Sequence, residues 1–182
     1  MAQSILNERL LMKKVNEQLL NELIELMNIN GYVINTPINS GLLEMLMKGS
    51  PQGLPADNAF AAIIEDVASF LRNEPDYILF LKVMDGFEFD GVIIYDFSVL
   101  PGEGELPVNN IFLNNDNFRN NDIYINSDLA ERVVIGQDST SFFTYDLNDK
   151  SYQIRDNIGT EKIYGVFGDF TDFLSAILST VK

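Results

Sequence analysis

The first thirty residues carry the 3.6-residue repeat of an amphipathic helix. Between residues 7 and 27 apolar side chains recur every four positions while charged side chains occupy the other faces. Asn30 and Gly31 follow as a stop signal, because glycine readily takes the left-handed conformation that ends a helix. The pattern predicts a helix whose apolar stripe is Leu11, Val15, Leu19 and Leu23.

Two shorter helices are predicted to follow, over residues 37–47 and 57–72. Thr36 and Asp57 are the residues expected to cap their N-termini. The connection over residues 49–55 holds two glycines and two prolines, and this composition indicates a hinge. We therefore expect one domain over residues 1–182, made of a helical N-terminal extension (1–53) and a core (54–182).

The pattern changes from helical to extended between residues 75 and 95. Pro75 suits the first position of a short helix, and Gly86 is expected to end it. Phenylalanines then alternate with Glu88 and Asp90, which predicts a strand that carries both carboxylates on one face. Gly91 marks a turn or bulge before a further β-branched strand.

Strands dominate the rest of the chain until a final amphipathic helix after Asp169, its expected cap. The segment over residues 114–122 is rich in asparagine and is predicted to form irregular turns. Helices at both ends of the chain and strands between them predict an α+β fold: a twisted, mostly antiparallel sheet with the helices packed on one face. The strands are expected at residues 87–89, 92–97, 110–113, 123–125, 132–135, 141–146, 152–155 and 163–167.

Three segments together resemble the SUKH superfamily, most closely its YrhA-like branch. They are the helix, Asp85-Gly86 stop and aromatic strand; the later hairpin over residues 134–156, in which a glycine precedes two strands joined by a polar turn; and the closing helix over residues 167–178. The family's usual Asn-Gly is Asp85-Gly86 here. The resemblance implies the fold just described and a function in binding and neutralising a cognate toxin domain, often a nuclease.

Composition limits the chemistry that the chain can perform. It has no histidine and no cysteine, which removes the usual general base, thiolate nucleophiles and the commonest ligands of transition metals. We expect no cofactor and no metal, and we expect a protein that is not an enzyme. The first residues lack the pattern of a signal peptide, and no apolar run is long enough to span a membrane, so we expect a cytoplasmic protein.

Acidic residues are concentrated in the middle of the chain. The formal net charge is −15, and nine carboxylates between Asp85 and Asp128 are accompanied by Arg119 alone. Such a field repels nucleic acid and anionic membranes and attracts basic proteins, although an acidic balance is also common in proteins that need only solubility. The residues predicted to contact a partner are Glu88, Asp90, Glu103, Glu105, Asp116 and Asp122.

The function expected from these observations is that of an immunity protein, a monomer or homodimer, that occludes a basic toxin domain. Two alternatives stay open. A housekeeping adaptor of the same fold would bind an endogenous regulatory protein. A hydrolase that depends on carboxylates would use residues such as Asp85, Glu88 or Asp90, and it would need two carboxyl groups with divergent pKa values in one pocket.

Overall fold

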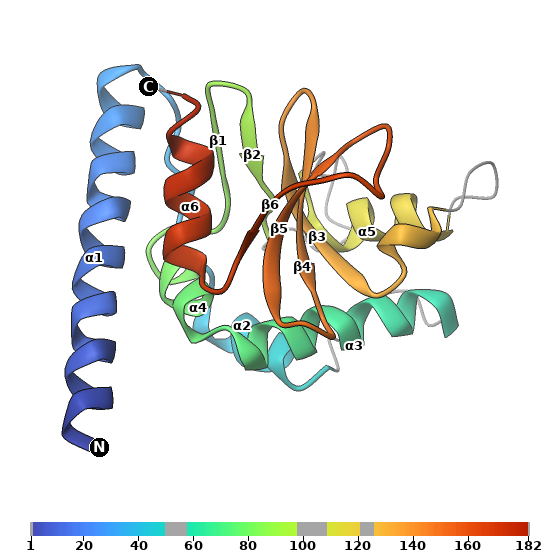
Figure 1. The fold of residues 1–182 in the computed structure, drawn as a ribbon, viewed down its shortest axis with the longest axis horizontal. Helices are drawn as coiled ribbons and strands as arrows, with labels where there is room; N and C mark the ends of the chain where they lie inside the picture. The colour runs from blue at the N-terminus through green and yellow to red at the C-terminus, as the bar shows by residue number, and fades with distance from the viewer. Residues whose placement is uncertain (1, 50–57, 98–108, 121–125, 182) are drawn as a thin grey trace.

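The computed structural model describes residues 2–49, 58–97, 109–120 and 126–181, and it confirms the α+β class (Figure 1). The candidate hinge and Asp57 lie outside these residues, as does the strand expected at 123–125. The helices are α1 (Ala2–Ile29), α2 (Ser40–Met47), α3 (Asn58–Asn73), α4 (Pro75–Leu81), α5 (Ile111–Asn120) and α6 (Phe170–Leu178), with a 3-10 turn at Ser127–Leu129. The strands are β1 (Phe87–Phe89), β2 (Val92–Ile94), β3 (Arg132–Gln137), β4 (Ser141–Asp146), β5 (Ser151–Asp156) and β6 (Ile163–Phe167).

The six strands form one sheet in which each strand lies beside its neighbour in the sequence. The order is β1-β2-β3-β4-β5-β6, and every pair is antiparallel. β1 and β2 are joined by the two residues Asp90 and Gly91, which have φ of 47° and 82°. Positive φ at both central residues is the signature of a type I′ hairpin turn, which suits the natural twist of the strands. This hairpin forms one edge of the sheet, and β6 forms the other.

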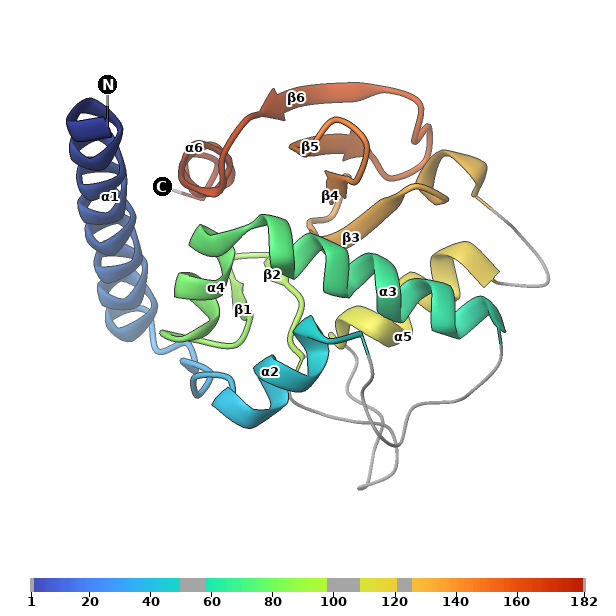
Figure 2. The ribbon, with the colours of Figure 1, turned by 90° about the horizontal axis from the view of Figure 1, so that it is seen from below.

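An aromatic core joins one face of the sheet to α3, α4 and α6. Tyr152 on β5 stacks on Phe173 of α6 with ring centroids 5.1 Å apart, and Tyr145 on β4 lies 4.8 Å from Phe70 of α3. Tyr77 of α4 joins the same cluster. Figure 2 shows α6, α4 and α3 grouped beside the curved sheet. The core is therefore built largely from rings that pack edge to face, the arrangement that aromatic pairs prefer.

α1 lies outside this layer and packs against α6 and α4 (Figure 1). Among its described side chains, Leu20, Leu23 and Met27 are buried, whereas Leu19 is only partly buried. Of the predicted stripe, Leu23 is buried and Leu19 packs partly buried against the core, and the side chains of Leu11 and Val15 lie outside the described ones. A strict four-residue repeat advances about 40° too far at each step of a 3.6-residue helix, so the true stripe shifts along the sequence. The helix ends as predicted at Gly31, which has φ of 74°.

One predicted helix begins later than expected, and the prediction of one strand was wrong. The helix expected from Pro37 begins at Ser40, because Asn39 rather than Thr36 caps it by accepting hydrogen bonds from two backbone N–H groups. The strand expected at 110–113 and the irregular turns after it are helix α5. Asn110 acts as the cap of α5, since its Oδ1 accepts hydrogen bonds from the N–H groups of Phe112 and Leu113 at 3.0 and 3.2 Å.

α5 takes the place of a strand beside the first half of β3. β2 pairs with β3 only near Gly136, so Val134 would lack a neighbour on that side. The Asn115 side chain fills the gap, because its amide donates to the Val134 carbonyl at 2.8 Å and accepts from the Val134 N–H at 2.9 Å. A buried side chain thus satisfies both backbone groups as a paired strand would.

The opposite face of the sheet holds a buried polar network around Gln153. Arg155 donates to Gln153 and to the Thr160 carbonyl, and Arg132 forms an ion pair with Asp146 at 2.9 Å. These arginines are paired within the fold, as buried charges must be. They therefore do not provide free positive charge at the surface.

Candidate functional site

The Asp85-Gly86 motif binds three segments of the chain together where β1 begins. The Asp85 side chain is buried and accepts a hydrogen bond from the Phe97 N–H at 3.0 Å. Its backbone N–H donates to the Thr36 carbonyl, and its carbonyl accepts from the Asn35 side chain at 2.8 Å. This aspartate thus fixes the segment after α1 against the hairpin.

Gly86 allows the chain to pass directly against β2. Its φ is 69°, and a Cβ atom there would lie 2.6 Å from the Ile94 carbonyl oxygen and 2.9 Å from the Asp96 nitrogen. Only glycine combines this backbone conformation with such a close approach. The motif that carried the family resemblance therefore has a clear structural role.

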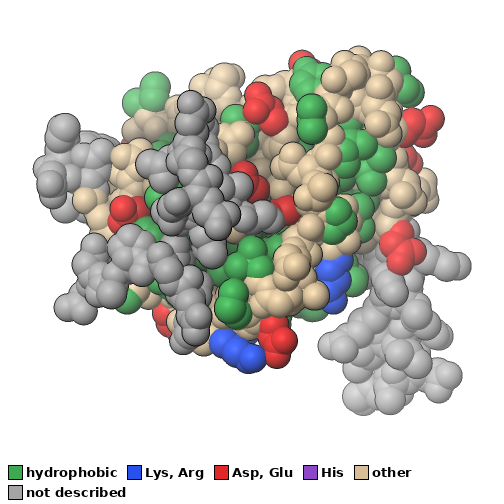
Figure 3. Space-filling view, turned by 180° about the vertical axis from the view of Figure 1, so that it is seen from behind, with side chains coloured by type: hydrophobic (Ala, Val, Ile, Leu, Met, Phe, Trp, Pro, Cys, Tyr) green, Lys and Arg blue, Asp and Glu red, His purple; other side chains and the backbone are tan. Residues whose placement is uncertain are grey.

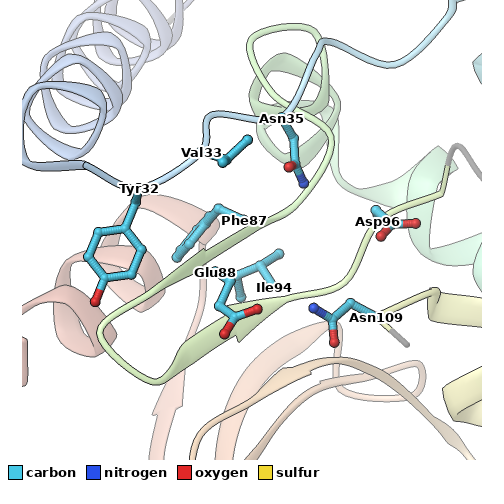
Figure 4. A pocket seen from close by; sticks show the side chains of 8 residues that line it. All are labelled: Tyr32, Val33, Asn35, Phe87, Glu88, Ile94, Asp96 and Asn109. Carbon is cyan, nitrogen blue, oxygen red and sulfur yellow. The ribbon is translucent and has the colours of Figure 1, made fainter. Parts of the chain in front are cut away.

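A cavity of about 320 Å³ lies beside this junction (Figure 4). Its walls come from the segment after α1, from the β1-β2 hairpin and from the chain that continues beyond β2. In Figure 4 the side chains of Glu88, Tyr32 and Asn109 point to the same side of the hairpin. The lining residues are Tyr32, Val33, Asn35, Phe87, Glu88, Ile94, Asp96 and Asn109.

The cavity is acidic on one part of its wall and apolar on another. Glu88 and Asp96 contribute carboxylates, and none of the described residues that line the cavity is basic. Val33 is 80% exposed and Tyr32 38% exposed. The Tyr32 ring stands edge-on to Phe89, with centroids 5.0 Å apart. A concave wall that combines apolar groups with a few polar ones is the usual composition of a binding site.

Asp96 is the most perturbed carboxylate of the cavity. Burial, reinforced by the neighbouring Asp85 carboxylate, raises the pKa of Asp96 to about 6, although the Asn110 side chain bonds to it. Its Oδ1 atom is buried and accepts no hydrogen bond within the described part of the chain. A buried acceptor without a partner costs free energy.

The predicted contact residues do not form one cluster among the described residues. Glu88 is exposed and lines the cavity. Asp90 lies in the hairpin turn, so the strand that was expected to carry both carboxylates ends before Asp90. Asp116 lies on α5 and accepts a hydrogen bond from Asn120 at 2.8 Å. Glu103, Glu105 and Asp122 lie outside the described residues.

The three carboxylates considered for a hydrolase point to different places. Asp85 is buried in the junction, Glu88 faces the cavity, and Asp90 is exposed at the hairpin tip. The carboxylate that accompanies Glu88 is Asp96, which sequence reasoning had assigned only to a strand. In residues 2–49, 58–97, 109–120 and 126–181, no three acidic side chains gather in a way that could hold a metal ion.

The side of the molecule opposite to the view of Figure 1 is mixed in character. Figure 3 shows acidic side chains there, with a few basic ones, among hydrophobic and uncharged side chains. A partner on this side would meet apolar and acidic groups together. None of the helices in the described parts of the chain combines the length and apolar character that a membrane span requires.

Comparison with known proteins places the chain in a family. YrhA of Escherichia coli K12, an uncharacterised protein, is 37% identical over 128 residues, which are 70% of this chain and 89% of YrhA. No protein-family model matches the chain, and no solved structure matches it. The identity and its extent over YrhA are sufficient to conclude that this chain belongs to the YrhA family.

Proposed function

We propose that the protein is a cytoplasmic, non-enzymatic binding module of the SUKH immunity type, which occludes a basic toxin domain by means of an acidic surface. The observation that carries the proposal is the cavity at the β1-β2 edge, where Glu88 and Asp96 meet exposed apolar groups and the described part of the wall holds no basic residue. The resemblance of the Asp85-Gly86 region to SUKH proteins supports the same function.

Electrostatics give the proposed mechanism a physical basis. A nuclease active site attracts phosphate with positive charge, and a protein with a formal net charge of −15 is attracted to the same field. Long-range attraction speeds encounter, while a few well-packed contacts set the lifetime of the complex. The mixed walls of the cavity provide both kinds of interaction in one place.

The partner is best sought by capture and then by kinetics. The tagged protein is incubated at low salt with a lysate of its native host, and bound polypeptides are identified after a graded salt wash. A stoichiometric basic polypeptide is expected. A neutral or acidic regulatory protein captured instead would overturn the toxin assignment and favour a housekeeping adaptor.

Charge reversal then tests whether the acidic surface makes the contact. Glu88→Lys should slow association with the captured partner by about tenfold at low salt and by less at high salt. The matched control is Glu161→Lys, because Glu161 is also exposed but precedes β6, at the opposite edge of the sheet. Equal association rates for the two variants would overturn the proposed role of the β1-β2 edge.

A further inference from the structure

The cavity beside the β1-β2 hairpin has the size of a pocket for one side chain. Its volume of about 320 Å³ is at the lower end of the range for small-molecule sites. Whole cofactors and nucleotides usually need more room, so an inserted side chain of a partner is the better match. The exposed Val33 and Tyr32 form an apolar entrance against which the aliphatic part of a long side chain can pack.

The polar groups of the cavity suit a cation that offers several hydrogen-bond donors. Glu88 and Asp96 supply carboxylate oxygens, and Asn35 and Asn109 supply amide groups from two other segments. The buried Oδ1 of Asp96 has no hydrogen-bond donor among the described residues.

We propose that the cavity receives an arginine side chain from the protein partner, with the guanidinium held between Glu88 and Asp96. The inference rests on the proposed function, which it makes more specific. A guanidinium is planar and offers five N–H donors in a fixed fork, so it can bond to carboxylates on two sides at once. It also stacks on aromatic rings, and the partly exposed Tyr32 ring provides one. Lysine would satisfy fewer of these acceptors.

The pocket can be tested directly with small probes and does not require the partner. N-acetyl-arginine methylamide is titrated into the isotopically labelled protein, and backbone amide shifts are followed by NMR at low salt. We expect shifts centred on Tyr32, Glu88 and Asp96. The citrulline analogue has nearly the same shape but no charge, and it should bind about tenfold more weakly, the factor expected for one charge-assisted hydrogen bond.

Variants of the protein show where the arginine probe binds and distinguish binding at this cavity from a general effect of the protein's charge. Glu88→Gln and Asp96→Asn keep the shape of the wall and should each weaken the arginine probe by about fivefold to tenfold. Glu161→Gln removes the same charge at the far edge of the sheet and should leave the affinity unchanged. The amide spectrum of each variant shows whether the fold is intact.

Several results would overturn the assignment. Equal binding of the arginine and citrulline probes would exclude recognition of the guanidinium, and equal binding of a lysine probe would exclude the preference for arginine. Shifts centred away from the hairpin would exclude this cavity. Because the probes are small molecules, failure here is separate from failure of the proposed function: a captured basic partner whose binding ignores Glu88→Gln would refute the pocket alone.

Discussion

Replacing Gly86 with alanine should destabilise the protein far more than the same change at Gly91. Both glycines have positive φ, 69° and 82°, so each substitution costs about 1 kcal/mol for placing a Cβ in the left-handed region. At Gly91 nothing lies within 4 Å of the new atom. At Gly86 the new atom would lie 2.6 Å from the Ile94 carbonyl oxygen, which belongs to the backbone and cannot rotate away.

The steric conflict at Gly86 adds to the conformational cost. Relieving it requires β2 to move away from the junction, which disturbs the pairing of Phe87 with Ile94. Overpacking of this kind costs about 1–3 kcal/mol, so the total for Gly86→Ala is about 2–4 kcal/mol. Gly91→Ala should cost about 1 kcal/mol.

Urea unfolding followed by circular dichroism measures both variants against the wild type. The expected midpoints fall in the order wild type, Gly91→Ala, Gly86→Ala, with unchanged slopes. In thermal melts the Gly86→Ala transition should lie about 4–16 °C below the wild type. Equal losses for the two variants would refute the close approach of β2 to Gly86, and with it the structural reason given for the motif.

Three further substitutions test buried polar groups by urea unfolding. Asn115→Ala should cost about 3 kcal/mol, because it leaves the Val134 N–H and carbonyl without partners; a loss below about 1 kcal/mol would contradict the strand-like role of this amide. Burial opposes ionisation of Asp146, but backbone N–H groups and Arg132 outweigh it and lower its pKa, so stability should fall as the pH drops below about 4, and Asp146→Asn should flatten that decline. The pKa of Asp96 is raised to about 6, so the folded protein retains a proton that the unfolded chain releases, and stability should fall as the pH rises from about 4 to 6. Asp96→Asn should remove that slope, and an unchanged slope would contradict its burial beside Asp85.

Local signals predicted those elements whose structure depends on their own sequence. Strands β4 and β6 have the predicted bounds. Asp169 caps α6 as predicted, because it accepts a hydrogen bond from the Asp172 N–H at 2.9 Å. Alternation of apolar residues and the residue type at a helix start are properties of a few neighbouring positions. Such features can be read without knowing what packs against them.

α5 could not be predicted because its reason lies elsewhere in the fold. Asparagine is a poor helix former, so a run of asparagines after Asn110 favours turns on local grounds. The helix forms where Asn115 completes the hydrogen bonding of β3, a contact between residues 19 positions apart. Tertiary hydrogen bonding has here outweighed local propensity.

The candidate site could be predicted only in part from the sequence, for a similar reason. Glu88 was singled out, and Asp85-Gly86 marked the place where the chain turns into the hairpin. Tyr32 and Val33 come from a segment without any recognisable motif, and they reach the cavity because Asp85 bonds to the backbone of Thr36. A pocket assembled from distant segments leaves no continuous pattern in the sequence.

The packing of α1 against α6 has a consequence for synthesis on the ribosome. The sheet adds its strands in chain order, so each strand finds its neighbour soon after it emerges. The part of the apolar face of α1 that packs on α6 instead waits for that helix, which is made after the whole sheet. At about 5–20 residues per second the delay is on the order of ten seconds, during which that face is open to chaperones or to a neighbouring nascent chain.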